Sequence, residues 1–452
     1  MTTHHHSPDE LSAFADLIRN EQIYLDHRDG VDRKRRRSRI LRGLSIVAIV
    51  IAVVLASIGA YVGWALNAPL SAPVVTWQAP QASAAGPAAI ALPTEGASAV
   101  SVSGAETYFG DAASGIWLTS GTNDPRPIAS ITKLITALVI LDALPLEGAD
   151  DPGPTITFDK ADHDLYDKYY VLGATIAAMP IGSSMSQHDA LATMLIPSAS
   201  NYAEAVSTWA FGSQGAFVSA ARDWLTAHGL TGTTIVEPTG LDARNTSTPT
   251  DLIAIGKLAA ANPAIAKIVA MPSLTLPGPG AMYNTNELLG TDGVSGLKTG
   301  NLGDGSHSLL YTASLDVGAG APLSMTGVVL SGFSDDSVNS TVLTLFDSIR
   351  RGFHTVPVVS SGRDVGSVAT PWGSTARVIV ADSASILTWS DTTITATMET
   401  ITPTTYEDGA VVGSITWSAG PNSVSVPVEI EGTIVPPTAW WRLTHPSQLG
   451  AP

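Results

Sequence analysis

The sequence predicts an α+β domain with an antiparallel sheet, followed by an all-β domain and preceded by one membrane-spanning helix. Three observations predict this order. A run of 23 uncharged residues lies near the N-terminus. Helical and strand-like patterns then alternate as far as about residue 353, and beyond it only short strand-like runs separated by Gly, Pro, Asp and Ser remain. A chain of 452 residues is long enough for two or three domains.

The uncharged run, Leu44–Leu66, is the predicted membrane anchor. At about 1.5 Å per residue it crosses a hydrocarbon core of about 30 Å. The Arg and Lys cluster from Arg33 to Arg39 holds the tail of residues 1–43 in the cytoplasm, and Tyr61 and Trp64 suit the outer interface. The rest of the chain is then extracytoplasmic. A cleaved signal peptide is the alternative, but its apolar region has only about 7–15 residues, so an uncleaved single-pass anchor is favoured.

Three further segments follow the anchor. Residues 67–88 are rich in Ala, Pro and Ser and predict an extended linker. Residues 89–353 form the predicted α+β domain, in which Ile128–Leu144 is a long apolar helix. Residues 354–452 form the predicted β-rich domain. Within the α+β domain, strands are expected at Val294–Thr299, Ser308–Ser314 and Ser324–Ser331.

Composition excludes several classes of function. The net charge is −17, and the 14 basic and 33 acidic residues beyond residue 43 make the extracytoplasmic part strongly acidic. Such a surface repels phosphate backbones, which argues against a nucleic-acid partner. The chain has no cysteine, so thiolate chemistry and cysteine-ligated metal sites are excluded. The histidines show no metal-ligand spacing, and neither a metal nor a cofactor is predicted.

Three short motifs occur in the order Ser130-Ile131-Thr132-Lys133, Ser198-Ala199-Ser200-Asn201 and Lys298-Thr299-Gly300. The first opens the apolar helix, the second lies between two helical stretches, and the third ends a predicted strand. S-x-x-K alone is weak evidence, because a serine-rich chain contains it by chance about once. K-T-G is rarer where lysine is scarce, so the ordered set indicates the chemistry of a serine nucleophile.

The spacing of the first motif has a physical meaning. Residues three apart on a helix share a face, so Ser130 and Lys133 lie side by side. A serine hydroxyl needs an adjacent base, and Lys133 can be that base if burial lowers its pKa towards neutrality. The positive end of the helix disfavours a protonated amine nearby, and it places the Ser130 backbone N–H where an oxyanion forms.

These motifs resemble those of the low-molecular-mass penicillin-binding proteins, which are serine D-alanyl-D-alanine carboxypeptidases. The resemblance extends over roughly residues 95–350, and the β-rich tail resembles the accessory domain of relatives from actinobacterial-type envelopes. It implies the fold of the penicillin-binding and serine β-lactamase transpeptidase domain. The stretches that carry it are Arg126–Lys133, Glu237–Asp242, Asn284–Leu289 and Gly293–Gly300.

The resemblance implies a role for each matching residue. Ser130 attacks the carbonyl between two D-alanines of a peptidoglycan stem pentapeptide and forms an acyl-enzyme, while Lys133 takes its proton. Ser198 relays a proton between the lysines and the leaving amine. Lys298, with Thr299 and Gly300, holds the terminal carboxylate. The backbone N–H groups of Ser130 and Asn301 form the oxyanion hole. β-Lactam antibiotics are then inhibitors that trap Ser130.

One departure from the family pattern concerns the second motif. The family has S-x-N, whereas here the third position is Ser200 and the asparagine follows at Asn201. Either Ser200 replaces the asparagine with a single hydroxyl, which weakens substrate binding, or a register shift brings Asn201 into the site. Two alternatives to the carboxypeptidase therefore stay open: a catalytically impaired penicillin-binding-like scaffold, and a β-lactamase.

Overall fold

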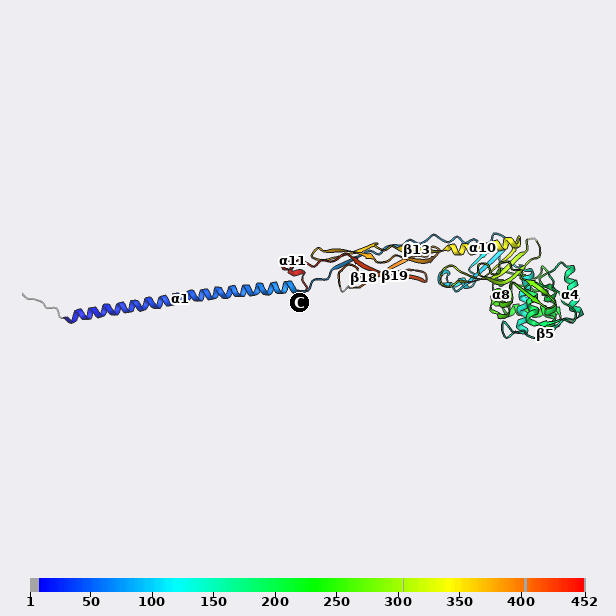
Figure 1. Ribbon diagram of the computed structural model, residues 1–452, viewed down its shortest axis with the longest axis horizontal. Helices are drawn as coiled ribbons and strands as arrows, with labels where there is room; N and C mark the ends of the chain where they lie inside the picture. The colour runs from blue at the N-terminus through cyan, green and yellow to red at the C-terminus, as the bar shows by residue number, and fades with distance from the viewer. Residues whose placement is uncertain (1–7, 304, 402–404, 451–452) are drawn as a thin grey trace, which may run out of the picture.

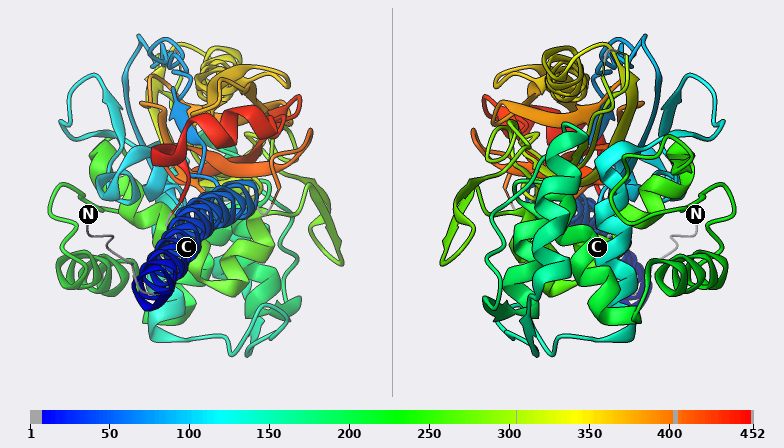
Figure 2. Two further views of the ribbon diagram at one scale, coloured as in Figure 1. Left: turned by 90° about the vertical axis from the view of Figure 1, so that its left-hand side faces the viewer. Right: turned by 90° about the vertical axis from the view of Figure 1, so that its right-hand side faces the viewer.

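The computed structural model describes residues 8–303, 305–401 and 405–450. The molecule is elongated: helix α1 forms one end, a β domain lies next to it, and a larger α+β domain forms the far end (Figure 1). Figure 2 views the same arrangement along the long axis from each end. The predicted fold class is confirmed, with an antiparallel sheet among helices, a second domain made of strands and an apolar helix in front.

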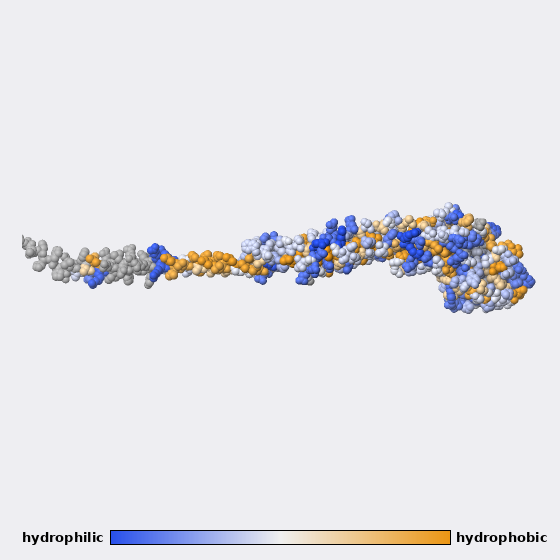
Figure 3. Space-filling view, turned by 45° about the horizontal axis from the view of Figure 1, so that its top comes forward, coloured by the Kyte–Doolittle hydropathy of each residue, from blue (hydrophilic) through white to orange (hydrophobic). Residues whose placement is uncertain are grey.

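Helix α1 runs without a break from Pro8 to Asn67. Its segment Arg35–Asn67 is long and apolar enough to cross a membrane, and none of its most apolar window is buried inside the protein. The predicted anchor, residues 44–66, lies within this segment. In Figure 3 the segment is a continuous apolar stretch that begins at a hydrophilic patch.

The α+β domain is built on a five-stranded antiparallel sheet in the order β10-β11-β12-β2-β3. Helix α8 packs on one face of this sheet and α10 on the other. Because both faces are covered, the strands are buried nearly along their whole length rather than alternating. The strand bounds are β2 Ala97–Ser103, β3 Leu118–Ser120, β10 Val294–Gly300, β11 His307–Leu315 and β12 Leu323–Gly332.

Most helices of this domain belong to one hydrophobic core on the α8 side of the sheet. Helix α3 is the most deeply buried of them, with every residue from Thr132 to Leu141 inaccessible to solvent or nearly so. The helices are α2 Glu106–Phe109, α3 Thr132–Ala143, α4 Lys160–Val171, α5 Gln187–Leu195, α6 Ser200–Phe211, α7 Gln214–Ala227, α8 Pro249–Ala261, α9 Pro263–Val269 and α10 Asp335–Gly352. Short two-stranded pairs lie around them: β4 Arg126–Pro127 with β7 Thr246–Ser247, β5 Thr155–Thr157 with β6 Ser184–Ser186, and β8 Ser273–Leu276 with β9 Gly280–Tyr283.

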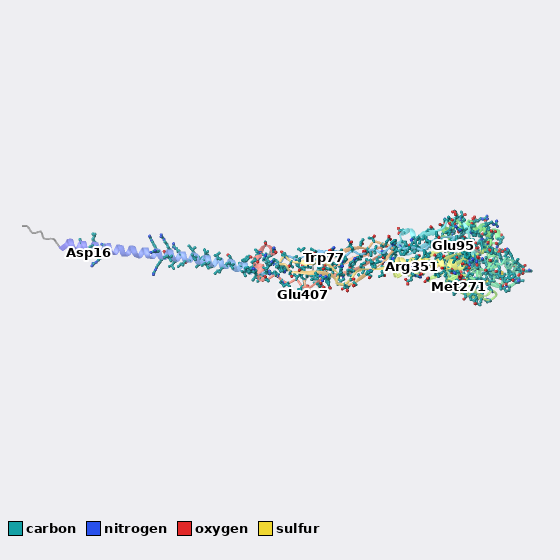
Figure 4. All side chains as sticks on the ribbon, turned by 90° about the horizontal axis from the view of Figure 1, so that it is seen from above. Asp16, Trp77, Glu95, Met271, Arg351 and Glu407 are labelled. Atoms are coloured by element: carbon teal, nitrogen blue, oxygen red, sulfur yellow. The ribbon has the colours of Figure 1, made fainter. Side chains whose placement is uncertain are left out.

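The β domain begins where α10 ends, at Gly352. It contains a six-stranded antiparallel sheet in the order β1-β14-β15-β19-β18-β17 and the pair β13-β16. Alternate side chains of these strands, such as those of Val426, Val428 and Ile430, form its core. In Figure 4, Trp77 and Glu407 mark this domain, and Glu95 and Met271 mark the α+β domain beyond it. The strands are β13 Phe353–Val359, β14 Asp364–Ala369, β15 Thr375–Val380, β16 Ala384–Trp389, β17 Thr395–Thr400, β18 Val411–Ala419 and β19 Asn422–Glu431.

The segment 67–88 differs from the linker that the sequence predicts. It contains β1, Val74–Trp77, which pairs with β14 at the edge of the six-stranded sheet. Further along, the backbone N–H of Ala88 donates to Ser390 Oγ. Although the segment is rich in Ala, Pro and Ser, the four residues of β1 favour a strand. They pair with the edge of β14 that no other described strand covers. The segment is therefore part of the β domain.

The C-terminal helix α11, Ala439–Thr444, returns to the end of α1. The Tyr61 hydroxyl donates to the Leu443 carbonyl at 2.7 Å, and Arg442 donates to the Ala68 carbonyl at 2.9 Å. The chain therefore runs from α1 along the β domain to the α+β domain. It then returns through the β domain, and the helix near its C-terminus contacts the end of α1.

Candidate active site

Ser130 and Lys133 lie at the start of α3 and contact each other. Ser130 is in a 3-10 turn, Ala129–Ile131, that leads directly into the helix. The Lys133 amine donates to Ser130 Oγ at 3.0 Å and to the Thr239 carbonyl oxygen at 2.7 Å. Ala129 has a φ of 48°, a left-handed conformation that alanine rarely adopts, and it sets the direction in which the Ser130 backbone enters the turn.

Burial determines the charge state of Lys133. Its side chain is fully inaccessible to solvent. Loss of hydration lowers the pKa of the amine from 10.5 to about 7, while the negative charge of Glu237 acts in the opposite direction. The neutral form of the Lys133 amine, which a general base for a serine hydroxyl requires, is therefore much more accessible near neutral pH than in an exposed lysine.

The loop Glu237–Asp242 closes over the start of α3. The Thr136 hydroxyl donates to the Pro238 carbonyl at 2.8 Å, one turn of α3 beyond the bond from Lys133 to Thr239. Gly240 has a φ of +86°, and a Cβ there would lie 1.9 Å from the carbonyl oxygen of Ala129. Only glycine lets this loop approach so closely the turn Ala129–Ile131, which carries the proposed nucleophile and is called the nucleophile turn below.

The third motif lies on β10 beside the nucleophile turn. Lys298 is buried, and its amine donates to Thr285 Oγ1 at 3.3 Å and to the Thr299 carbonyl at 3.3 Å. Burial, with the nearby Lys133 adding to the effect, holds the pKa of Lys298 well below its usual range. A Cβ at Gly300 would lie 2.6 Å from the Ile128 carbonyl oxygen, so the strand end packs directly on the turn that carries Ser130.

The second motif lies between α5 and α6. Ser198 has a φ of 69°, and its buried hydroxyl has no hydrogen-bond partner among the residues that the structure describes. Ser200 begins α6 and lines the same cavity as Ser130. Asn201 is fully buried, and its amide both accepts from the Ala177 N–H at 3.1 Å and donates to the Ala177 carbonyl at 2.8 Å. Of the two positions that the sequence left open, Ser200 is therefore the one at the cavity.

A cavity of about 570 Å³ joins these elements. Ser130 lies in its wall together with Ser200 and Asn301, so residues of the first two motifs meet there with the residue that follows the third. Asn301 accepts from the Gly303 N–H through its side chain, which shapes the turn after the third motif. Among the described residues, no group of three or more His, Asp or Glu side chains could hold a metal ion. The cavity is lined by Ser130, Leu172, Gly173, Ala174, Thr175, Ser200, Leu241, Asn301, Leu302 and Gly303.

Two residues at the site have no role in the sequence-based prediction. Glu237 accepts the hydrogen bonds that shape the loop over Lys133. Thr285 lies between Lys298 and Thr299, with its hydroxyl 2.6 Å from Thr299 Oγ1. Both belong to stretches that resemble the family motifs, so the sequence already indicated that these stretches matter. Which groups the two side chains contact is visible only in the tertiary structure.

A buried lysine bonded to a serine at the start of a helix is the arrangement that a serine nucleophile with a neighbouring base requires. Comparison of the chain with models of known protein families identifies its family. The model of the D-alanyl-D-alanine carboxypeptidase family, peptidase S11, matches residues 94–325, and the chain belongs to this family.

The proteins similar to the chain include two curated relatives and a solved structure. The D-alanyl-D-alanine endopeptidase of Pseudomonas aeruginosa is 30% identical over 198 residues, which are 42% of this chain and 60% of the relative. The D-alanyl-D-alanine endopeptidase of Escherichia coli K12 is 31% identical over 198 residues, 41% and 58% of the two chains. The chain thus spans about three fifths of the length of these relatives. Penicillin binding protein 6B of Escherichia coli has a similar fold, with a TM-score of 0.50 and 20% identity over 74% of this chain and 95% of that one.

Proposed function

We propose that the protein is a serine peptidase that hydrolyses the D-alanyl-D-alanine bond of peptidoglycan stem peptides through an acyl-enzyme on Ser130. The observation that carries the proposal is the contact between Ser130 Oγ and the buried Lys133 amine at 3.0 Å, in the wall of the cavity that Ser200 and Asn301 also line. A neutral amine at this distance can accept the hydroxyl proton.

The reaction takes two steps. In the first, Ser130 Oγ attacks the carbonyl carbon of the penultimate D-alanine while its proton passes to Lys133 Nζ. The carbon–nitrogen bond then breaks, and the leaving nitrogen takes that proton through the Ser198 hydroxyl, which has no other described partner. In the second, water attacks the ester, gives its proton to Lys133, and Ser130 leaves with that proton restored.

Substrate binding follows from the third motif. The amine of Lys298 and the hydroxyl of Thr299 are the donors for the terminal carboxylate, and Gly300 lets their strand lie against the nucleophile turn. The backbone N–H groups of Ser130 and Asn301 are the donors for the oxyanion. A β-lactam carries both a carboxylate and a reactive amide, so it acylates Ser130 in the same way.

The primary candidate activity is that of a carboxypeptidase, in which the leaving amine is the terminal D-alanine. An endopeptidase is the second candidate, because both curated relatives bear that name. In that case the leaving amine belongs to a second, cross-linked stem peptide. The acyl group that Ser130 accepts and the residues that act on it are the same in both cases, and only the leaving amine, and therefore the bond broken, differs.

The proposed location is the cell membrane, with the active site outside the cytoplasm. The uncharged part of α1 has the length of a bilayer core, and the Arg and Lys residues before it favour a cytoplasmic N-terminus. Carbonate extraction of membranes tests this location, and recovery of the protein in the soluble fraction would contradict it.

Labelling with a fluorescent penicillin tests the chemistry. We expect the wild type and a matched control, Ser361→Ala in the β domain, to form a stable adduct that Ser130→Ala does not form. Rapid loss of the label would instead indicate a β-lactamase, and no labelling of the wild type would indicate a non-catalytic scaffold. Mass spectrometry then separates the two peptidases: loss of one alanine from a stem pentapeptide marks the carboxypeptidase, and conversion of a cross-linked dimer to monomers marks the endopeptidase.

A further inference from the structure

Glu237 is the residue that organises the loop over Lys133. One of its carboxylate oxygens accepts from the Thr239 N–H and from the Thr239 hydroxyl, each at 2.7 Å. The other accepts from the Gly240 N–H at 2.6 Å and from the Asn245 amide at 2.9 Å. A carboxylate that accepts four close hydrogen bonds, three from its own loop and one from Asn245, favours one conformation of that loop.

The same loop supplies the second hydrogen-bond acceptor of the base. The Thr239 carbonyl oxygen accepts from the Lys133 amine at 2.7 Å, the shorter of the two bonds that this amine makes. Thr239 is fully buried, and both its N–H and its hydroxyl are bonded to Glu237. The orientation of the Thr239 peptide group, and with it the direction of the Lys133 amine, therefore depends on Glu237.

We propose that Glu237 is a positioning residue for the general base: its carboxylate holds in place the Thr239 carbonyl that directs the Lys133 amine at Ser130. This role rests on the proposed function, because it requires Lys133 to be the base.

Glu237 also acts on Lys133 through its charge. Burial lowers the pKa of Lys133 to about 7, and the negative charge of Glu237 limits this decrease. Removal of the charge should therefore lower the pKa further, and the amine should lose its proton at a lower pH. A residue that only supported the loop would reduce activity at every pH without moving this transition.

Other charged and titratable groups near Glu237 and Lys133 come from several elements. Lys298 of β10 is buried and interacts with Lys133. Tyr169 of α4 interacts electrostatically with Glu237, and its hydroxyl donates to Glu204 of α6 at 2.5 Å. Burial and the two carboxylates raise the pKa of Tyr169, so it stays neutral over the range of the experiment. Asp242 bonds to the exposed Arg244 and is held ionised by it, so neither changes charge there.

The experiment measures the rate of acylation by a fluorescent penicillin from pH 5 to pH 9 in the full-length protein. For Glu237→Gln we expect the plateau rate to fall by about tenfold or more, because the amide NH2 replaces one of the two acceptor oxygens and so faces the donors of either Thr239 or Gly240. We also expect the midpoint of the acidic limb to move to lower pH by about one unit. Glu237→Asp keeps the negative charge, but its shorter side chain does not reach the donors of the loop. Its plateau rate of acylation should therefore fall, while the midpoint of its acidic limb stays at the wild-type pH.

Asp251→Asn is the matched control. The Asp251 carboxylate also holds a loop, by accepting from the Gly232 N–H at 2.9 Å and from the Thr233 hydroxyl at 2.8 Å, but it has no bond to the loop over Lys133. For Asp251→Asn, the midpoint of the acidic limb and the plateau rate of acylation should match those of the wild type. An unmoved midpoint in Glu237→Gln, or a wild-type plateau in either Glu237 variant, would overturn the proposal. If Glu237→Gln does not fold, the plateau of Glu237→Asp decides. Absence of labelling in the wild type would be a different failure, that of the proposed function itself.

Discussion

Substitution of Gly240 by alanine tests whether the loop over α3 positions the nucleophile. The Cβ of an alanine at this position would lie 1.9 Å from the carbonyl oxygen of Ala129 and 2.4 Å from its carbonyl carbon. Ordinary contacts of a Cβ begin at 3.4 Å. The loop and the nucleophile turn must therefore separate by more than an ångström. Ser130 follows Ala129 in the turn and Thr239 precedes Gly240 in the loop, so this separation displaces both residues.

Two effects contribute to the expected result. Alanine at a φ of +86° costs about 1–2 kcal/mol of folding free energy in any context. Displacement of the reacting groups by about 1 Å reduces catalysis by about a hundredfold. We therefore expect acylation by a fluorescent penicillin to be slower by about two orders of magnitude, and the loss of stability to exceed that from the backbone conformation alone.

Gly182→Ala separates these effects. Gly182 also has a positive φ, +75°, but a Cβ there meets nothing within 4 Å. This variant should lose stability in a urea titration while its folded fraction acylates at the wild-type rate. If folded Gly240→Ala also acylates within about threefold of Gly182→Ala, the claim that this loop fixes the geometry of Ser130 and Lys133 is refuted.

Three further predictions concern the base and the second motif. The rate of acylation should rise about tenfold per pH unit below pH 7 and level off above it, because Lys133 accepts a proton only when it is neutral; a rate independent of pH between 5 and 8 would contradict its role. Ser200→Asn should raise kcat/KM for a stem pentapeptide by about fivefold, measured by release of D-alanine, since a carboxamide offers more hydrogen-bonding groups to the substrate than one hydroxyl. An unchanged value would mean that Ser200 does not occupy the place of the family asparagine. Asn201→Leu should lower the free energy of unfolding in urea by about 2–4 kcal/mol, because the N–H and the carbonyl of Ala177 lose their buried partners, and a wild-type midpoint would show that water replaces them.

Much of the fold could be predicted from the sequence because its signals are local. The uncharged run of residues 44–66 has the length of a bilayer core whatever surrounds it, and it lies within one uninterrupted helix. The spacing of Ser130 and Lys133 places them on one helical face, and the structure brings them within 3.0 Å. The pattern before Lys298 predicts a strand that ends at the third motif, as β10 does.

Other features depended on contacts between distant parts of the chain. The four-residue strand β1 has no clear signal in a segment rich in Pro and Ala, and it forms because the edge of β14 is available to it. Spacing alone allowed Ser200 or Asn201 to enter the site. The structure separates them, since the helix that begins at Ser200 turns Asn201 towards the backbone of Ala177.

The properties of Lys133, the proposed base, divide in the same way. The sequence alone determined that a lysine follows Ser130 by one helical turn, because that relation depends only on helix periodicity. Only the tertiary structure decided that this amine is fully buried and that the Thr239 carbonyl, 106 residues away, accepts its second hydrogen bond. Burial and neighbouring charges arise from groups that the chain brings together from far apart, so the pKa of Lys133 is a property of the folded domain and not of its motif.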